Sequence, residues 1–187
     1  MATAVSNNGT AKQAATNGSG VNTAFRKHTL SLLVNNKPGV LIRIALVFAR
    51  RAYNIDSLVV SPSKDPSFSV MNIVASGDEK VLDQILKQLN KLVDVLHASD
   101  RTGQDIIQRE LALFKLHCEE DARSDVLQLA HAMNCEIVEV SEHVTILQMT
   151  GDTERLDSAH RVFEKYGVEE MIRTGKVLMA RGQEITS

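Results

Sequence analysis

Two asparagines and a glycine, in and near one loop, are the residues of this sequence best suited to bind a small molecule. Asn35 to Gly39 separates an alternating apolar stretch from a run in which apolar residues recur at helical spacing. A helix that starts after such a loop presents free backbone N–H groups, which favour an anion such as a carboxylate. The side-chain amides of Asn36 and Asn54 both donate and accept hydrogen bonds, which suits an α-amino acid. The same residue types also occur in ordinary turns.

No group of residues in the sequence has the spacing of a catalytic or metal site. Ser141, Glu142 and His143 are neighbours at a predicted turn, but sequence neighbours do not form a catalytic triad. His117 and His143 could meet across strands around a metal ion, although solvated positions are the more common arrangement. Cys118 alternates with core residues and is interpreted as a small buried hydrophobe. This pattern favours a protein that binds and regulates.

The periodicity between residues 28 and 99 predicts the element order βαββαβ. Apolar residues alternate or cluster between turn residues in four predicted strands, at 29–35, 55–61, 68–75 and about 95–99. Helices are predicted over 40–51 and from Asp78 onward. Their apolar faces consist of Leu41, Ile44, Ala45 and Phe48 in the first, and Leu82, Ile85, Leu89, Leu92 and Val93 in the second. This order is typical of a ferredoxin-like fold.

After a linker at 100–104 the same order of elements repeats. Strands are predicted at 110–118, 135–140, 144–150 and 168–172, with a further short strand at 176–180. Helices are predicted over 121–133 and from Asp152 to Gly167. The sequence therefore predicts an α+β protein made of two tandem ferredoxin-like βαββαβ domains.

The composition is that of a globular chain with a distinct N-terminal segment. The 187 residues have a formal net charge of −2, and 43% of them are apolar. The absence of a basic run argues against nucleic acid as a main partner, and no apolar run reaches the ~18 residues of a membrane span. Residues 1–26 are rich in Ala, Asn, Thr, Gly and Ser and are expected to form a disordered tail. Two cysteines without metal-ligand spacing fit a reducing cytoplasm, and plastid import stays open because the tail resembles a transit peptide only weakly.

Several stretches resemble one known family. Asn35-Asn36-Lys37-Pro38-Gly39-Val40-Leu41 is similar to the opening of an ACT domain, a βαββαβ module that senses small molecules. Further stretches resemble the regulatory small subunit of acetolactate synthase (acetohydroxyacid synthase), at 51–58, 79–82, 87–95, 109–111, 173–175 and 181–182. The resemblance covers about residues 28 to 182. It implies an ACT domain at 28–101 for effector binding and dimerisation, and a ferredoxin-like domain at 108–182 that activates the catalytic subunit.

The resemblance implies a regulator rather than an enzyme. Small subunits of this family bind a large catalytic subunit that carries thiamine diphosphate, FAD and Mg²⁺, raise its activity and confer feedback inhibition by valine in branched-chain amino-acid biosynthesis. Leucine or isoleucine stay open as effectors. A homodimer through the ACT domain is implied, with no catalytic, metal or cofactor site on this chain and no nucleic-acid or membrane partner. The effector-binding residues map to Asn36, Pro38, Gly39, Val40 and Leu41, with Asn54 from the dimer mate and the adjacent Ile55.

Two positions depart from the family pattern, and two other functions compete with it. Ala52 stands where the family usually has Gly, and a positive φ there would cost up to about 1 kcal/mol. Lys37-Pro38 replaces a more usual acidic-small pair, which bears on effector preference.

A stand-alone ACT-domain amino-acid sensor or transcription regulator would need a basic helix-turn-helix or ribbon, and the sequence shows neither. An enzyme on the same fold would need a catalytic cluster, which the sequence also lacks.

Overall fold

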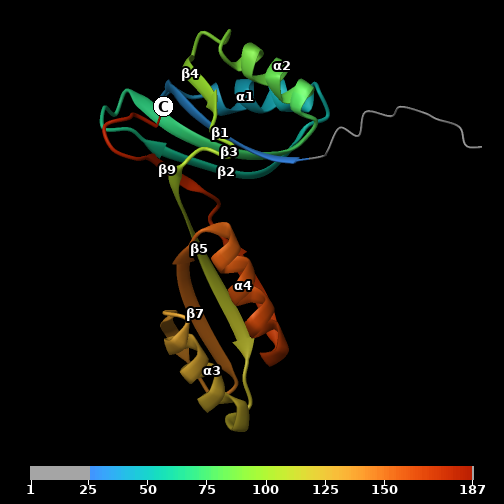
Figure 1. Cartoon of the computed structure of the whole chain (residues 1–187), viewed down its shortest axis with the longest axis vertical. Coiled ribbons are helices and arrows are strands. Elements are labelled where there is room, and N and C mark those ends of the chain that lie inside the picture. The colour runs from blue at the N-terminus through green and yellow to red at the C-terminus, as the bar shows by residue number, and fades with distance from the viewer. Residues whose placement is uncertain (1–25, 187) are drawn as a thin grey trace, which may run out of the picture.

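The computed structural model describes residues 26–186, which form two α+β domains (Figure 1). The first domain consists of β1 (Arg26–Asn35), α1 (Val40–Ala49), β2 (Asn54–Pro62), β3 (Phe68–Gly77), α2 (Glu79–Leu89) and β4 (Val95–Asp100). Its antiparallel sheet has the strand order β2-β3-β1-β4, and both helices lie on one face of it. The predicted βαββαβ order is confirmed. The expected disordered tail, 1–26, lies outside the described residues except for Arg26, which begins β1.

The second domain repeats this architecture. It consists of β5 (Ile106–His117), α3 (Glu120–Ala132), β6 (Glu136–Val140), β7 (Val144–Gly151), α4 (Thr153–Phe163), a 3-10 turn (Glu164–Tyr166) and β8 (Val168–Arg173), followed by β9 (Val177–Ala180). The sheet order is β6-β7-β5-β8, and β9 pairs only with β5. Two tandem ferredoxin-like domains are therefore confirmed. Among the helices between residues 26 and 186, none combines the length and the apolar character needed to cross a bilayer.

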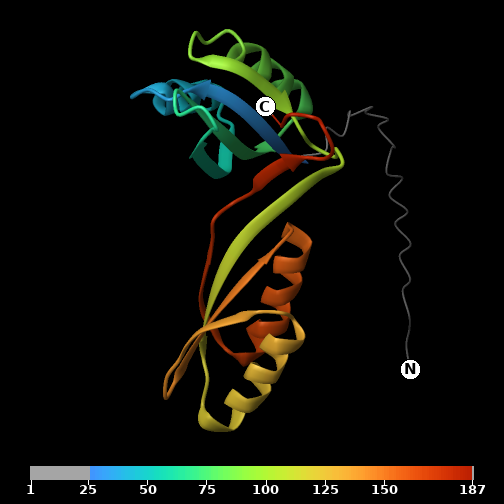
Figure 2. The same cartoon turned by 90° about the vertical axis from the view of Figure 1, so that its left-hand side faces the viewer.

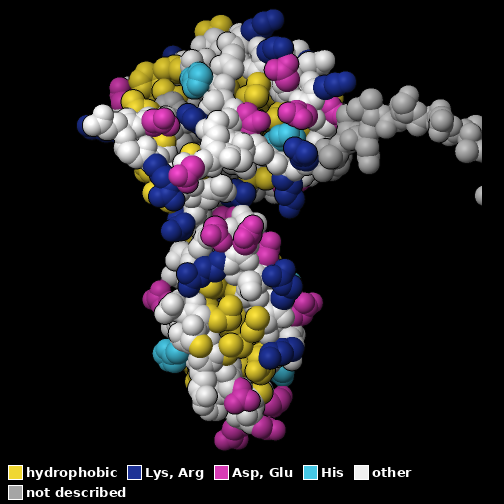
Figure 3. All heavy atoms as spheres, in the orientation of Figure 1, with side chains coloured by type: hydrophobic (Ala, Val, Ile, Leu, Met, Phe, Trp, Pro, Cys, Tyr) yellow, Lys and Arg dark blue, Asp and Glu magenta, His cyan; other side chains and the backbone are white. Residues whose placement is uncertain are grey.

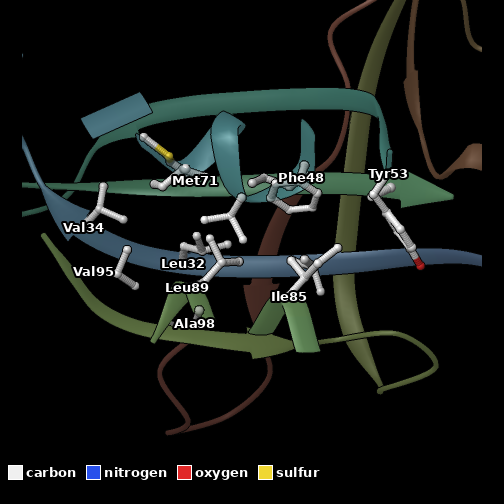
Figure 4. Close-up of a cluster of buried hydrophobic side chains, with 14 of the residues drawn as sticks. Leu32, Val34, Phe48, Tyr53, Met71, Ile85, Leu89, Val95 and Ala98 are labelled. Atoms are coloured by element: carbon white, nitrogen blue, oxygen red, sulfur yellow. The ribbon is translucent and has the colours of Figure 1, made fainter. Parts of the chain in front are cut away.

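The core of the first domain lies between the sheet and its two helices. Leu30, Leu32 and Val34 alternate along β1 and are fully buried, as the period of two predicts. Phe48 from α1 and Ile85 from α2 fill the space between helices and sheet (Figure 4). Burying side chains of this size contributes about 1.5–3 kcal/mol each, so this cluster holds the helices in place over the sheet.

A second, separate core fills the second domain. The rings of Phe114 on β5 and Phe163 on α4 lie 5.7 Å apart between their centroids, in a tilted arrangement that is favourable for aromatic pairs. Cys118 and Cys135 are both buried free thiols, as the sequence predicted. Burial raises the pKa of each thiol, which keeps both in the protonated, unreactive form.

The two domains meet at a shared strand and a covering segment. β5 begins at Ile106, earlier than the predicted strand at 110, because residues 106–109 pair with β9 instead of with the second sheet. Residues 110–117 then pair with β7, and part of the same stretch also pairs with β8. Figure 2 shows β9 and the segment after it passing beneath the first sheet, on the face opposite the helices. The linker predicted at 100–104 corresponds, to within one residue, to the turn at 101–105 between β4 and β5.

Two positions predicted on the apolar helix faces are exposed instead. Leu41 is 42% exposed, because the buried stripe of α1 runs through Val40, Ile44, Val47 and Phe48. Val93 is 95% exposed, because α2 ends at Leu89 and Val93 lies in the turn beyond it. The side chain of Asn90 directs this turn: its amide donates to the Ala98 carbonyl, and its oxygen accepts from the Ala98 N–H, both at 2.9 Å.

The chain leaves α1 through a residue in the left-handed region. The helix ends at Ala49 rather than at the predicted Arg51, and Ala52 has a φ of 51°. The N–H of Tyr53 donates to the Phe48 carbonyl at 3.1 Å across this turn. Since a side chain at positive φ crowds the neighbouring carbonyl, the strain expected for Ala52 is present.

Replacing Ala52 by Gly should raise the free energy of unfolding by roughly 0.5–1 kcal/mol, because glycine adopts this conformation without strain. Ala45→Gly is the matched control, since it makes the same change at a half-buried position inside α1. That control should lower stability by roughly 0.5–1 kcal/mol. Thermal or denaturant unfolding of both variants tests this, and loss of stability in Ala52→Gly would contradict the presence of strain at this residue.

Candidate functional site

Backbone hydrogen bonds hold the loop between β1 and α1 in place. The N–H of Asn35 donates to the Asp94 carbonyl, and the N–H of Asn36 donates to the Ser67 carbonyl, both at 2.8 Å. The side-chain amide of Asn36 donates to the Pro66 carbonyl at 3.0 Å. This bond uses the amide nitrogen and fixes the orientation of the side chain, so the exposed carboxamide still has an oxygen that can accept from a ligand.

Helix α1 begins at a glycine and has no side-chain cap. Gly39 has a φ of 84°, in the left-handed region, and no side chain accepts from the N–H groups of the first turn. The N–H of Val40 reaches the Lys37 carbonyl only at 3.4 Å. By contrast, α2 and α4 are capped by the side chains of Asp78 and Asp152. The start of α1 is therefore a place where backbone donors and the positive end of the helix dipole favour an anion.

A charged pair lies beside the loop. Arg43, in the first turns of α1, contacts Asp94 at 2.6 Å, and the amide of Asn35 donates to the same carboxylate at 3.3 Å. The hydrogen bond from Asn35, together with the Arg43 guanidinium, lowers the pKa of the Asp94 carboxyl. Neither Arg43 nor Asp94 was predicted from the sequence. An arginine one helical turn after Gly39 was a signal that would have identified the first of them.

The predicted site residues fall into two groups in the chain. Asn36, Pro38, Gly39, Val40 and Leu41 lie together at the start of α1. Val40 is buried in the core, so only its backbone faces a ligand, whereas Pro38 and Leu41 are exposed.

Asn54 and Ile55 lie at the other end of the same sheet. Asn35 is opposite Phe68 on β3, whereas Asn54 is opposite Ser76, which is eight residues further along that strand. At about 3.3 Å per residue this separates them by about 26 Å. Within one chain the two groups therefore do not form one site. The amide of Asn54 donates to Asp56 at 2.8 Å, and its side chain is exposed.

The corresponding helix start in the second domain is acidic. Glu119 precedes α3, and Glu120 and Asp121 lie in its first turn. His117 and His143 do meet, with ring centroids 6.2 Å apart, and Glu119 lies 3.0 Å from His117. All of these side chains are exposed, and within the described residues no group of His, Cys, Asp and Glu has metal-binding geometry.

The neighbouring turn does not form a catalytic triad. The hydroxyl of Ser141 donates to the Val144 carbonyl at 3.1 Å, and it belongs to the turn that also contains Glu142 and His143. The hydroxyl therefore stabilises the turn. The imidazole of His143 faces Glu119 at 3.7 Å instead.

Residues near the domain junction are engaged within the chain. The Arg173 guanidinium lies 2.6 Å from Asp157 and 4.0 Å from Glu110, which is buried. The hydroxyl of Thr174 accepts from the Leu111 N–H at 3.1 Å. Two of the stretches that resemble the small-subunit family, 109–111 and 173–175, therefore meet each other here. Their contacts fasten the end of β8 to β5 and α4.

Two family models match the two domains separately. The model described as AHAS small subunit-like ACT domain matches residues 30–97, and the model described as small subunit of acetolactate synthase matches residues 109–182. The probable acetolactate synthase small subunit of Archaeoglobus fulgidus is 40% identical over 158 residues, which covers 84% of this chain and 99% of that protein. The chain belongs to the acetolactate synthase small-subunit family.

Other relatives agree in both domains. The acetolactate synthase small subunit of Mycobacterium leprae is 39% identical over 155 residues, covering 83% of this chain and 92% of that protein. The chloroplastic small subunit 2 of Arabidopsis thaliana is 39% identical over 156 residues, but the chain covers only 32% of its length. The crystal structure of the small subunit from Thermotoga maritima is 36% identical, with a TM-score of 0.75 and coverage of 85% of this chain and 99% of that one.

Family membership confirms the sequence interpretation of the chain as a regulatory, non-catalytic subunit of acetolactate synthase with an N-terminal ACT domain. A small subunit of this enzyme has a catalytic subunit as its partner. Every α-helix among residues 26–186 belongs to one of the two ferredoxin-like domains. On the face shown in Figure 3, basic and acidic side chains are interspersed.

Proposed function

We propose that this small subunit binds valine at the start of α1 and thereby confers feedback inhibition on the catalytic subunit. The observation that supports this most strongly is the uncapped helix start at Gly39, with a positive φ and the exposed Asn36 beside it. The valine carboxylate accepts from the N–H groups of Gly39 and Val40. The long Val40–Lys37 hydrogen bond is readily replaced, because a charged acceptor binds an N–H more strongly than a carbonyl does.

The proposed sensor is a homodimer through β2. This strand is at an edge of the first sheet, where unpaired backbone groups favour pairing with another strand. Antiparallel pairing of two β2 strands about a two-fold axis brings Asn54 of one chain beside Pro62 of its mate. Pro62 leads into the turn whose carbonyls at Pro66 and Ser67 hold Asn36. The dimer thus reunites the two groups of residues that are separate in one chain.

Exposed apolar side chains lie along the same side of the domain. Helix α1 lies over the β2 side of the sheet, whereas α2 lies over the β4 side. Three large apolar residues of α1 are exposed, Leu41, Ile42 and Leu46, and Val60 on β2 is exposed as well. Pairing through β2 removes such surface from water, which stabilises association at about 25 cal/mol per Å² of apolar area.

The remaining groups of the amino acid have partners in this arrangement. The oxygens of Asn36 and of the mate's Asn54 accept from the valine ammonium, and Leu41 offers apolar contact to its side chain. A pocket of this kind separates ligands that differ by one methylene by only about 1–3 kcal/mol. Leucine and isoleucine are therefore the competing effectors, and Pro38 stiffens the loop that would have to adapt to them.

The two domains divide the work in this proposal, with sensing in 28–101 and activation in 108–182. The acidic start of α3 would repel a carboxylate, so the second domain does not duplicate the effector site. Its complete fold instead presents a surface to the catalytic subunit, which holds the thiamine diphosphate, FAD and Mg²⁺. Effector binding alters activity because valine binds one arrangement of the complex better than another.

A chain that ends at Gly103 tests this division. It retains the complete first domain and the hydrogen bond from the Thr29 N–H to the Thr102 hydroxyl. We expect it to bind valine in calorimetry but to leave the activity of the added catalytic subunit nearly unchanged. Circular dichroism and sedimentation establish that the shortened chain is folded and dimeric. Full activation with retained valine inhibition would show that the second domain is mainly structural.

A further inference from the structure

The C-terminal segment is fastened against the first sheet. Gly175 has a φ of 87°, and a Cβ at this position would lie 3.0–3.2 Å from Ser57 and Val59 on β2. The Arg101 guanidinium donates to the Thr186 carbonyl at 2.7 and 3.1 Å. The hydroxyl of Thr186 in turn accepts from the Ala180 N–H at 2.8 Å. Residues 175–186 therefore form a fixed layer beneath the sheet, on the side away from α1 and α2 (Figure 2).

A cavity of about 860 Å³, widely open to solvent, lies between this layer and the sheet. The sheet contributes Leu33 and Val70, and the C-terminal segment contributes Val177, Met179 and Ile185. The last three side chains are 50%, 61% and 81% exposed, so apolar surface faces the cavity without being covered. Cavities of this size and character are typical of small-molecule sites.

One buried polar side chain in the cavity wall lacks a partner. Asn72 lines the cavity and is 5% exposed, and its Oδ1 accepts no hydrogen bond from the described residues. Ser31, directly opposite on β1, has a buried hydroxyl that is also unpartnered among these residues. A buried carboxamide oxygen without a donor is unfavourable. Exchanging the positions of the carboxamide oxygen and nitrogen would turn the oxygen toward the cavity, where a donor on an occupant satisfies it.

We propose that this inter-domain cavity binds a small apolar molecule that carries one N–H or O–H donor, which hydrogen-bonds to Asn72. The apolar body lies against Val70, Met179 and Ile185. This site is distinct from the proposed valine site, because it is on the opposite face of the sheet from α1. Since its walls come from both domains, an occupant stabilises their present arrangement.

Indole and 1-benzothiophene are a matched pair of probes for this site. They have nearly the same shape, but only indole has an N–H donor. Ligand-observed NMR on the full chain should show that both bind at millimolar concentration, with indole about tenfold tighter. In Asn72→Leu the difference between the two probes should disappear, because the acceptor is gone while the branched shape of the side chain is kept.

Ile185→Glu locates the site, and Val93→Glu is its control. Both replace a strongly exposed apolar residue by a carboxylate, but only Ile185 lines the cavity. We expect binding of both probes to weaken at least tenfold in Ile185→Glu and to be unchanged in Val93→Glu. Thermal unfolding confirms that each variant is folded. Failure of both probes to bind, unaltered binding in Ile185→Glu, or an indole preference that persists in Asn72→Leu would each overturn the proposal.

Discussion

Replacing Gly39 by Asp is expected to abolish valine binding while leaving the fold intact. The substitution places a carboxylate at the start of α1, where it takes the backbone donors intended for the ligand and repels the valine carboxylate. A Cβ at Gly39 would come no closer than 3.5 Å to its nearest neighbour, Arg43, so space does not prevent folding. Calorimetry should show at least a hundredfold loss of affinity.

Gly103→Asp is the control for the backbone effect of this change. Gly103 also has a positive φ, of 70°, and a Cβ at this residue would meet nothing within 4 Å beyond its chain neighbours. Both variants therefore carry the same strain, of roughly 1–2 kcal/mol, but only Gly39→Asp alters the proposed site. Valine affinity in Gly103→Asp should equal that of the unaltered chain. Retained binding in Gly39→Asp would place the effector elsewhere.

Two variants that each fail to bind valine should together restore one site. In the proposed dimer each site combines the loop of one chain with Asn54 of its mate. A heterodimer of Gly39→Asp and Asn54→Ala therefore has one site in which both parts are altered and one in which both are intact. Calorimetry on the heterodimer, isolated through two different affinity tags, should give one valine per dimer with the affinity of the unaltered protein.

The two variant homodimers are the controls for this experiment. Neither should contain an intact site, because every loop or every Asn54 is altered in them. The roughly 26 Å between Asn54 and the loop within one chain is the reason for expecting complementation. A heterodimer without a site of full affinity would show that the loop does not bind together with the mate's Asn54.

Much of the fold was predictable because its local signals agree with one another. The alternation of Leu30, Leu32 and Val34 predicts β1, and the capping residues Asp78 and Asp152 predict the starts of α2 and α4. The buried thiols and the order of elements were also predicted. These features depend on period, caps and turns, which are local properties of the sequence.

The errors in the predicted structure arise where contacts between residues far apart in the sequence determine the fold. Residues 106–109 were not predicted as a strand, because their partner β9 lies about seventy residues later in the chain. Leu41 was predicted to be in the core because of its helical spacing, but it is exposed, and Val47 belongs to the buried face of α1 instead. The engagement of Arg173 with Asp157 could not be inferred from either residue alone.

The candidate site was only partly predictable for a similar reason. Asn36, Gly39 and Asn54 were selected by residue type and by resemblance, and the left-handed conformation of Gly39 agrees with that selection. The pairing of Arg43 with Asp94 was missed, because it joins α1 to the turn before β4. The contribution of Asn54 depends on a second chain, which no pattern within one sequence specifies.

Valine bound at the Gly39 loop is proposed to control the catalytic subunit. The most direct test is the acetolactate synthase activity of the purified catalytic subunit, measured with this chain and increasing valine. With the unaltered chain, activity should rise on addition of the small subunit and fall as valine is added. With Gly39→Asp, activity should rise equally and stay constant at every valine concentration. Inhibition by valine that persists unchanged with Gly39→Asp would contradict the proposal that valine regulates the enzyme from this loop.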